Sequence, residues 1–188
     1  MSDDLVWRLG ARHPGHDYRV FTTHFVDAAH PRTGATKRFS VIEAVDWVNV
    51  IALTPDDQVV LIQQYRAGTS SLCLEIPGGM VDAGESAAEA AARELVEETG
   101  YTAPVWKLLG TTAPNPAIMT NHLWTYLALD AVPTHAQRPD GSEVIALETR
   151  SLADVRTALR DGRIDHALVV AAFGLLAFEL GELRRPTG

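Results

Sequence analysis

The sequence has few of the features that mark secreted or membrane proteins. Its single cysteine, Cys73, cannot form an internal disulfide, so we expect a reducing compartment and a cytoplasmic location. The longest apolar run, residues 167–178, is too short to span a bilayer. The first ten residues carry acids where a signal peptide carries positive charge. We therefore expect no secretion signal and no membrane role.

The sequence also lacks an excess of basic residues. It has 16 Lys and Arg against 24 Asp and Glu, a formal net charge of -8. Such a chain repels phosphate backbones, so we expect no binding to nucleic acid, and an anionic substrate would need a local site. Internal repeats and low-complexity tracts are missing as well, and 188 residues suffice for one main core with a small appendage.

The first half of the chain is rich in β-forming segments. Residues 18–24 and 37–44 flank the turn-rich stretch HPRTG and predict an N-terminal antiparallel β-hairpin. Residues 47–53 and 58–64 flank the turn TPDD and predict a second hairpin. This pattern divides the chain into an N-terminal β extension, residues 1–45, and a main domain, residues 46–188.

The rest of the main domain mixes strands and helices. Short apolar runs predict strands at 72–76, 105–112, 123–129 and 144–148. Ser151 is placed to cap a helix up to Asp161, and Asp165 to cap another through Leu180.

The segment GGMVDAGESAAEAAARELVEETGY contains an unusually acidic helix. Ser86 and Glu89 form an S-x-x-E capping box and Gly100 is suited to a left-handed C-terminal cap, so we expect a helix over Ala87–Thr99. A turn of about 100° per residue places three carboxylates on one narrow face. They are those of Glu94, Glu97 and Glu98.

Such clustering needs a compensating interaction. Like charges three or four residues apart destabilise a helix, and acids at its C-terminal end oppose the helix dipole. A solvated acidic face explains little of this arrangement. Hard divalent cations explain it, because Mg²⁺ binds carboxylate oxygens, keeps several waters and completes its octahedron with substrate phosphates. The preceding glycines let the backbone approach closely, so that a main-chain carbonyl near Gly78 can join the carboxylates.

The segment resembles the full signature of the Nudix hydrolases. Gly79, Glu85, the run REL at residues 93–95, the run EETG at 97–100 and Tyr101 occupy its fixed positions. The resemblance implies an α/β/α sandwich with a mixed β-sheet, here preceded by the N-terminal hairpin. It also implies hydrolysis of a nucleoside diphosphate linked to another group.

The same resemblance implies roles for the residues of the signature. Metal ligands would be Gly78, Glu94, Glu97 and Glu98, with Mg²⁺ as the cofactor and Mn²⁺ as a substitute. Glu94 and Glu98 would also take part in catalysis. Glu85 and Arg93 would orient the loop and the helix through an ion pair.

Residues outside the signature indicate one branch of the family. The runs QYR at 64–66 and EIPGG at 75–79, and Pro116, resemble ADP-ribose and nucleoside diphosphate sugar pyrophosphatases. Arg66 could pair with a substrate phosphate and Glu75 could accept a hydrogen bond from a ribose or base. Trp47 could stack on the base, with Phe39 and Tyr18 as alternatives, although core packing is the simpler interpretation for each aromatic ring.

The general base is left open among three residues. The resemblance implies a glutamate in the loop before the last strand, for which Glu143 is the candidate and Asp140 the substitute; Glu98 remains if neither reaches the metals. We expect a homodimer, because related enzymes pack a similar extension across a dimer. Alternatives are a pyrophosphatase for dinucleotides such as NADH or dinucleoside polyphosphates, and a non-catalytic nucleotide-sensing module. His122 and His166 are expected to be ordinary polar or core histidines.

Overall fold

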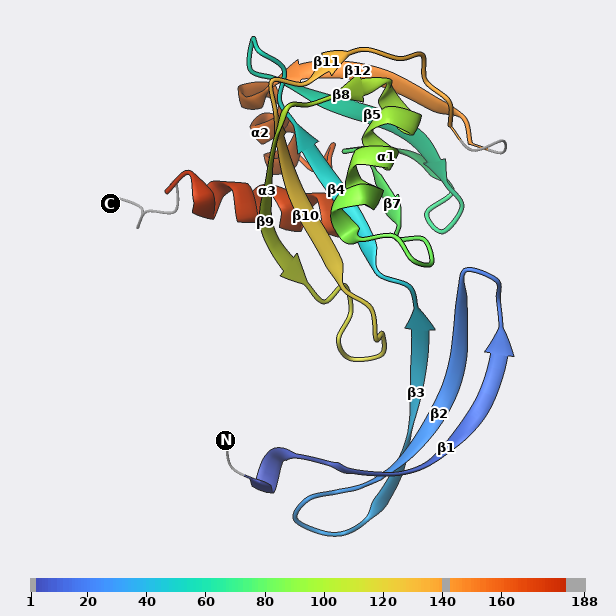
Figure 1. Ribbon diagram of the computed structural model, residues 1–188. Coiled ribbons are helices and arrows are strands. Elements are labelled where there is room, and N and C mark those ends of the chain that lie inside the picture. Colours follow the sequence, from blue (N-terminus) through green and yellow to red (C-terminus); the bar gives the residue numbers. More distant parts are fainter. Residues whose placement is uncertain (1–2, 140–142, 182–188) are drawn as a thin grey trace, which may run out of the picture. The chain divides into compact units, whose positions relative to one another are not determined.

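A computed structural model describes residues 3–139 and 143–181, and they form two compact units (Figure 1). Of the described residues, the first unit contains 3–45 and 113–122, and the second contains 46–112, 123–139 and 143–181. Residues 113–122, which were expected within the main domain, group with the N-terminal unit in the structure. In the part of the chain that the structure describes, no helix is long and apolar enough to cross a membrane.

The N-terminal unit is built on a three-stranded antiparallel sheet in the order β1-β2-β3. It begins with the short 3-10 helix η1 (Asp3–Leu5), followed by β1 (Arg8–Asp17), β2 (Phe21–Ala29) and β3 (Thr36–Ala44). The pairing of β2 with β3 confirms the predicted hairpin. The sequence analysis missed β1, because this strand contains Gly10, Pro14 and Gly15 and pairs with β2 through two irregularities.

The second unit contains a mixed four-stranded sheet, a three-stranded antiparallel sheet and a two-stranded ribbon, in the orders β7-β4-β10-β9, β12-β5-β6 and β11-β8. Strand β10 runs parallel to β4 and antiparallel to β9. The strands are β4 (Trp47–Ala52), β5 (Gln58–Arg66), β6 (Ser71–Glu75), β7 (Gly78–Met80), β8 (Tyr101–Thr102), β9 (Val105–Thr112), β10 (Leu123–Leu129), β11 (Val132–Pro133) and β12 (Ile145–Ser151). The helices are α1 (Ala87–Thr99), α2 (Leu152–Arg160) and α3 (Ala167–Glu179).

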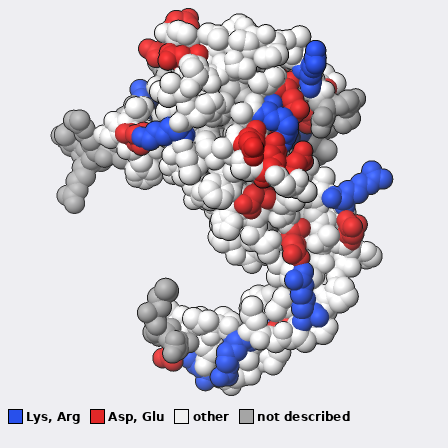
Figure 2. All heavy atoms as spheres, in the orientation of Figure 1, with Lys and Arg blue, Asp and Glu red and all other residues white. Residues whose placement is uncertain are grey.

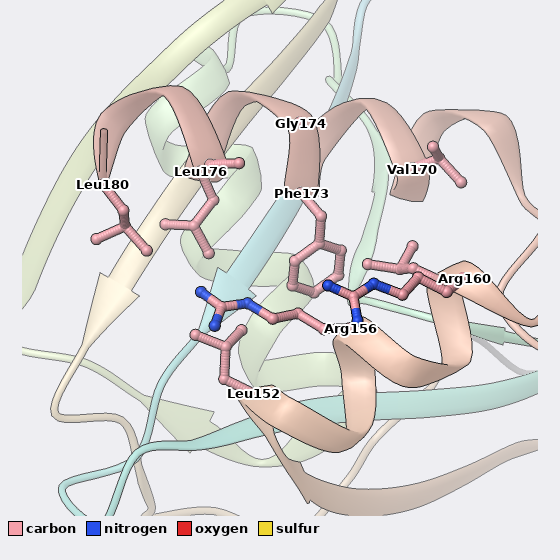
Figure 3. Close-up of a pocket in the computed structure, with 10 residues that line it drawn as sticks. Leu152, Arg156, Arg160, Val170, Phe173, Gly174, Leu176 and Leu180 are labelled. Atoms are coloured by element: carbon pink, nitrogen blue, oxygen red, sulfur yellow. The ribbon is translucent and has the colours of Figure 1, made fainter. Parts of the chain in front are cut away.

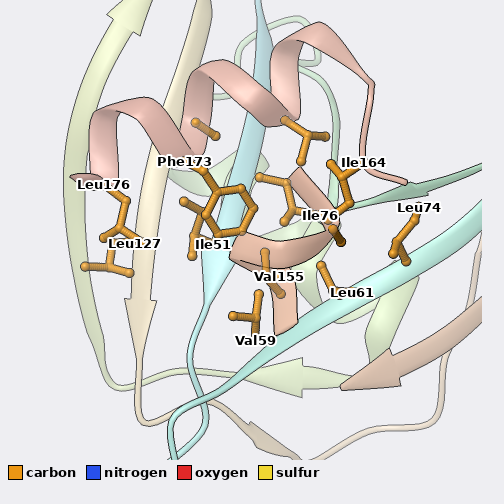
Figure 4. Packing of buried hydrophobic residues seen from close by; sticks show 13 residues of the cluster. Ile51, Val59, Leu61, Leu74, Ile76, Leu127, Val155, Ile164, Phe173 and Leu176 are labelled. Carbon is orange, nitrogen blue, oxygen red and sulfur yellow. The ribbon is translucent and has the colours of Figure 1, made fainter. Parts of the chain in front are cut away.

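Helices cover both faces of the central strands. On β4, Ile51 faces a cluster that includes Phe173 of α3 and Val155 of α2, and Figure 4 shows this packing. Val48 and Val50 face the opposite cluster, which contains Leu95 of α1. Because both faces are covered, the strand is a nearly continuous apolar run rather than an alternating one. The result is the predicted α/β/α sandwich with a mixed sheet.

Two predictions about local connections were wrong. Strands β4 and β5 belong to different sheets, and the turn between them is closed by an isolated bridge between Leu53 and Val59. Strand β10 pairs along the whole of β4, and β7 pairs with its first three residues on the other edge. The N-cap residue of α3 is His166, without a side-chain hydrogen bond, and not the predicted Asp165. Ser151 caps α2 as predicted, because its side chain accepts a hydrogen bond from the backbone N–H of Asp154.

Candidate active site

Helix α1 carries the acidic residues and spans Ala87–Thr99, as predicted. The Ser86 hydroxyl accepts from the backbone N–H of Glu89, and the Glu89 carboxylate accepts from the backbone N–H of Ser86. Gly100 ends the helix with a φ of 75°, a conformation that glycine adopts without steric cost. These local signals fix the register of the helix, and with it the directions in which its carboxylates point.

Glu98 is the most buried of these acids. It is 2% exposed, and its Oε2 accepts a hydrogen bond of 2.8 Å from the backbone N–H of Gly78. Burial raises the pKa of Glu98 to about 8, against the opposing effect of this hydrogen bond, and the nearby charges of Glu94 and Glu143 raise it further. The carboxyl group is thus fixed in position in surroundings that disfavour its ionised form.

Arg93 connects the other acids. Its Nε and Nη2 lie 2.9 and 3.0 Å from the two oxygens of Glu85, so the ion pair expected from the sequence is present. Nη2 also donates to the carbonyl of Met80, and Nη1 donates to Glu94 and Glu97 at 2.8 and 3.0 Å. These contacts lower the pKa of Glu85 and raise that of Arg93. One guanidinium therefore ties the loop before α1 to the acidic face of the helix.

The glycines before α1 allow the loop and the acids to approach closely. A Cβ added to Gly79 would lie 2.3 Å from Oε1 of Glu94, and one added to Gly78 would lie 2.3 Å from the carbonyl oxygen of Val48. Burial raises the pKa of Glu94, although its hydrogen bond with Arg93 opposes the shift. The close approach places the loop backbone directly beside the carboxylates.

These groups share one cavity of about 440 Å³ in the second unit. Over α1, acidic side chains gather around a basic one on the surface (Figure 2). The cavity brings together most of the residues that the sequence analysis selects, namely Trp47, Arg66, Glu75, Gly78, Glu94, Glu97, Glu98 and Glu143.

Arg66 and Glu75 face each other across β5 and β6. Arg66 Nε and Nη2 donate to the two oxygens of Glu75 at 2.8 and 2.7 Å. Glu75 is 3% exposed, and the bidentate pair raises the pKa of Arg66. Arg66 is thus held rigidly at the cavity wall rather than lying free on the surface.

Some selected residues are not brought to this cavity. Pro116 lies in the segment that groups with the N-terminal unit. Asp140 lies outside the described residues. Phe39 packs edge to face against Trp7 with ring centroids 5.1 Å apart, and Tyr18 packs against Phe21, all within the N-terminal unit.

The carboxylates suit a hard divalent cation, although they do not form a ready coordination sphere. Within residues 3–139 and 143–181, no three His, Cys, Asp or Glu side chains converge on one point. Glu94 and Glu97 turn to Arg93, and Glu98 turns to Gly78. The donor set is nevertheless all oxygen, as Mg²⁺ prefers, and a cation would relieve the burial and repulsion that raise the pKa values of Glu94 and Glu98.

A second hollow, of about 370 Å³, lies between α2 and α3. Figure 3 shows the guanidinium groups of Arg156 and Arg160 directed into the space between these helices, beside Phe173 and Leu152. Its lining is otherwise apolar and contains no carboxylate, so it offers nothing to a cation.

Sequence reasoning missed part of the cavity wall. Asn49 of β4 and His166 at the start of α3 line it, as does Gln64. A hydrogen bond of 3.2 Å from Asn49 Nδ2 to the carbonyl of Leu168 joins residues 119 positions apart. No local pattern signals this contact, because it depends on the docking of α3 against the sheet.

A match to a protein-family model shows which family this chain belongs to. The model described as NUDIX domain matches residues 44–173, which include the cavity, both sheets that line it and α1. The chain belongs to the Nudix family. The prediction that it is a Nudix pyrophosphohydrolase is confirmed by the family model and by relatives named as hydrolases.

Several Nudix relatives match over most of this chain. The ADP compounds hydrolase NudE of Escherichia coli is 31% identical over 166 residues, 84% of each protein. The ADP-sugar pyrophosphatase of Mus musculus is 33% identical over 153 residues, 74% of this chain and 69% of the mouse protein. Other relatives match over a smaller part of their length, between 27% and 48% in four cases.

A solved structure supports the same conclusion. The crystal structure of an ADP compounds hydrolase has a TM-score of 0.82 and 26% sequence identity, and the match covers 94% of this chain and 95% of the other. The predicted fold class and the predicted branch of the Nudix family are therefore confirmed.

Proposed function

We propose that the protein hydrolyses the diphosphate bond of ADP-ribose or another nucleoside diphosphate sugar, giving a nucleoside monophosphate and a sugar phosphate. The observation that carries this proposal is the single cavity in which the carboxylates of α1, Glu143 and the guanidinium of Arg66 meet. Such a cavity offers oxygen ligands to cations and a planar donor to a phosphate. The relatives named for ADP-sugars and ADP compounds support the choice of substrate.

Members of this family generally use divalent metals, and we infer that Mg²⁺ is the ion here, with Mn²⁺ as a substitute. Its ligands would be Glu94, Glu97, Glu98 and the main chain at Gly78. When bound, the ion would neutralise charge on the diphosphate and make water more acidic.

The other residues of the cavity would position the carboxylates, bind the phosphate and accept the proton. The backbone N–H of Gly78 holds the Glu98 carboxylate in one orientation, and Arg93 positions Glu94 and Glu97. Arg66, fixed by Glu75, would bind a phosphate oxygen. Glu143 would accept a proton from the attacking water as the P–O bond of the diphosphate breaks, and the leaving phosphate would carry away the electron pair.

The proposal is tested by incubating the purified protein with ADP-ribose and chromatographing the products. We expect AMP and ribose phosphate with Mg²⁺ or Mn²⁺, and neither product with a chelator. Glu98→Gln should abolish turnover while the protein stays folded, and Glu179→Gln, an acid of α3 outside the cavity, should not. Binding without turnover would indicate a nucleotide sensor instead.

The same assay with other substrates separates the alternatives within the family. Values of kcat/KM for NDP-sugars, NADH and dinucleoside polyphosphates should be highest for an NDP-sugar. A clear preference for a dinucleotide would contradict the proposed substrate.

We also propose that the protein forms a homodimer through its N-terminal extension. In the three-stranded sheet, only His24 and Ala28 are buried, and β1 is exposed along almost its whole length. A three-stranded sheet needs a covered apolar face to be stable, and a second copy would supply one. Size-exclusion chromatography with light scattering should give twice the chain mass; a monomer would contradict this proposal.

A further inference from the structure

One wall of the active-site cavity has no role in the chemistry described so far. It consists of Asn49, Leu123, His166, Leu168 and Val169, which come from β4, β10 and the start of α3. We call these five residues the neutral wall, because none of them is Asp, Glu, Lys or Arg. Arg66, Glu75 and the acids of α1 also line the cavity. The lining thus combines charged groups, suited to a diphosphate, with the neutral wall.

Asn49 presents a buried acceptor at this wall. The residue is 5% exposed, and its Nδ2 donates to the carbonyl of Leu168, which fixes the orientation of the amide. Among the described residues, Oδ1 has no hydrogen-bond partner. A buried acceptor without a partner is unfavourable, so a ligand that brings a donor here gains more than it would at an exposed site.

His166 adds a second polar atom. It is the N-cap residue of α3, but its side chain makes no capping hydrogen bond. Its Nδ1 is buried and, within the described part of the chain, has no hydrogen-bond partner. A neutral histidine nitrogen either donates or accepts according to its tautomer, and the first amides of a helix are donors without intrahelical partners. Donors and acceptors therefore stand together beside the apolar side chains of Leu123 and Val169.

The position of Asn49 limits what can bind. Asn49 is paired with Gly78 across β4 and β7, and the N–H of Gly78 holds the Glu98 carboxylate. The wall therefore begins one strand away from the proposed cation site. A group attached directly to the diphosphate can reach it, and an anionic oxygen would be repelled by Asn49 Oδ1. A hydroxyl group, which both donates and accepts, meets both requirements.

We propose that the neutral wall binds the sugar at the far end of the diphosphate from the nucleoside. One sugar hydroxyl donates to Asn49 Oδ1, and another exchanges a hydrogen bond with His166. This inference rests on the proposed function, in which Arg66 and Glu75 serve the phosphate and the nucleoside. It makes Asn49 and His166 residues that select the sugar.

The test compares two ligands that cannot be hydrolysed, the α,β-methylene analogue of ADP-ribose and α,β-methylene ADP, by calorimetry with Mg²⁺. The second ligand lacks the distal sugar and ends in a terminal phosphonate with one more ionisable oxygen, so each variant is compared with the wild type on the same ligand. His166→Leu should raise the Kd of the first about tenfold and change that of the second less than about twofold, as expected for the loss of a hydrogen bond. His166→Gln, which keeps a donor and an acceptor, should recover most of the affinity.

Two further variants serve as a control and as an independent repeat of this test. Asp165→Asn, a change at an exposed neighbour outside the cavity lining, should alter neither Kd. Asn49→Leu should repeat the pattern of His166→Leu, with thermal unfolding measured to confirm that it folds; if it does not fold, the two His166 variants decide the question. Equal losses for both ligands, or no loss for either, would overturn the proposal.

The outcome also separates this inference from the proposed function. If the wild-type protein hydrolyses no NDP-sugar, the proposed function fails. If it hydrolyses ADP-ribose but His166→Leu changes the Kd of both methylene analogues equally, the function stands and the neutral wall does not bind the sugar.

Discussion

Binding of Mg²⁺ should depend steeply on pH because of Glu98. Its pKa in the metal-free protein is about 8, raised mainly by burial. The cation needs the ionised carboxylate, so below this pH each bound ion must displace a proton. The apparent Kd for Mg²⁺ should therefore increase about tenfold for each pH unit below about 8, and roughly fifty- to a hundredfold between pH 8 and pH 6.

Isothermal titration calorimetry at about pH 6, 7 and 8, in two buffers with different heats of ionisation, measures both the affinity and the protons released. We expect close to one proton per ion at the lower pH values. Glu98→Gln should weaken binding at the highest pH and flatten the pH profile, whereas Glu179→Gln should leave it unchanged. A Kd that varies less than about threefold over this range, with no proton release, would refute the reasoning.

The same pKa shift predicts how the metal-free protein responds to pH. A carboxyl group whose pKa rises on folding binds its proton more tightly in the native state. The stability that Glu98 contributes is therefore complete below its ordinary pKa of 4.5 and is lost as the pH rises through about 8. With a chelator present, the melting temperature of the wild-type protein should fall more between pH 4.5 and about pH 8 than that of Glu98→Gln. Adding Mg²⁺ should reduce this difference.

Three other predictions concern the neighbours of Glu98. Arg93→Lys keeps the charge but cannot bridge Glu85, Glu94 and Glu97, so urea denaturation should show a loss of about 2 kcal/mol, whereas Arg163→Lys at an exposed pair should cost far less. Gly79→Ala places a Cβ 2.3 Å from Glu94 Oε1; the carboxylate should shift, and kcat should fall at least about tenfold while the melting temperature changes little. If Glu143 is the general base, Glu143→Gln should lower kcat about a hundredfold or more at unchanged KM, and Asp140→Asn should not; the reverse result would reassign the base.

The parts of the fold that sequence reasoning found are those with local causes. The bounds of α1 follow from the capping box at Ser86, the alanines and the stop at Gly100, all within one short segment. The ion pair of Arg93 with Glu85 and the location of Glu94, Glu97 and Glu98 beside one cavity follow from that helix and its loop. The family signature adds roles that no propensity could supply.

The parts that it missed depend on distant segments. Strand β1 contains Gly and Pro, and its pairing with β2 overrides this poor β-propensity. Strand β4 pairs in parallel with β10, 76 residues later in the sequence, so the short turn before β5 wrongly suggested a hairpin. Asn49 and His166 meet at the cavity only because α3 docks against β4, which no local motif reports.

The N-terminal unit takes its residues from two separate stretches of the chain. Between β9 and β10 the chain leaves the second unit, and residues 113–122 attach to β3: the N–H of Ile42 donates to the carbonyl of Ile118, and the N–H of Thr120 donates to the carbonyl of Ile42. Deleting residues 1–45 would thus remove the backbone hydrogen-bond partner of residues 113–122, which is Ile42. A chimera that exchanges the extension with that of a relative should carry both stretches together, because these backbone hydrogen bonds join them.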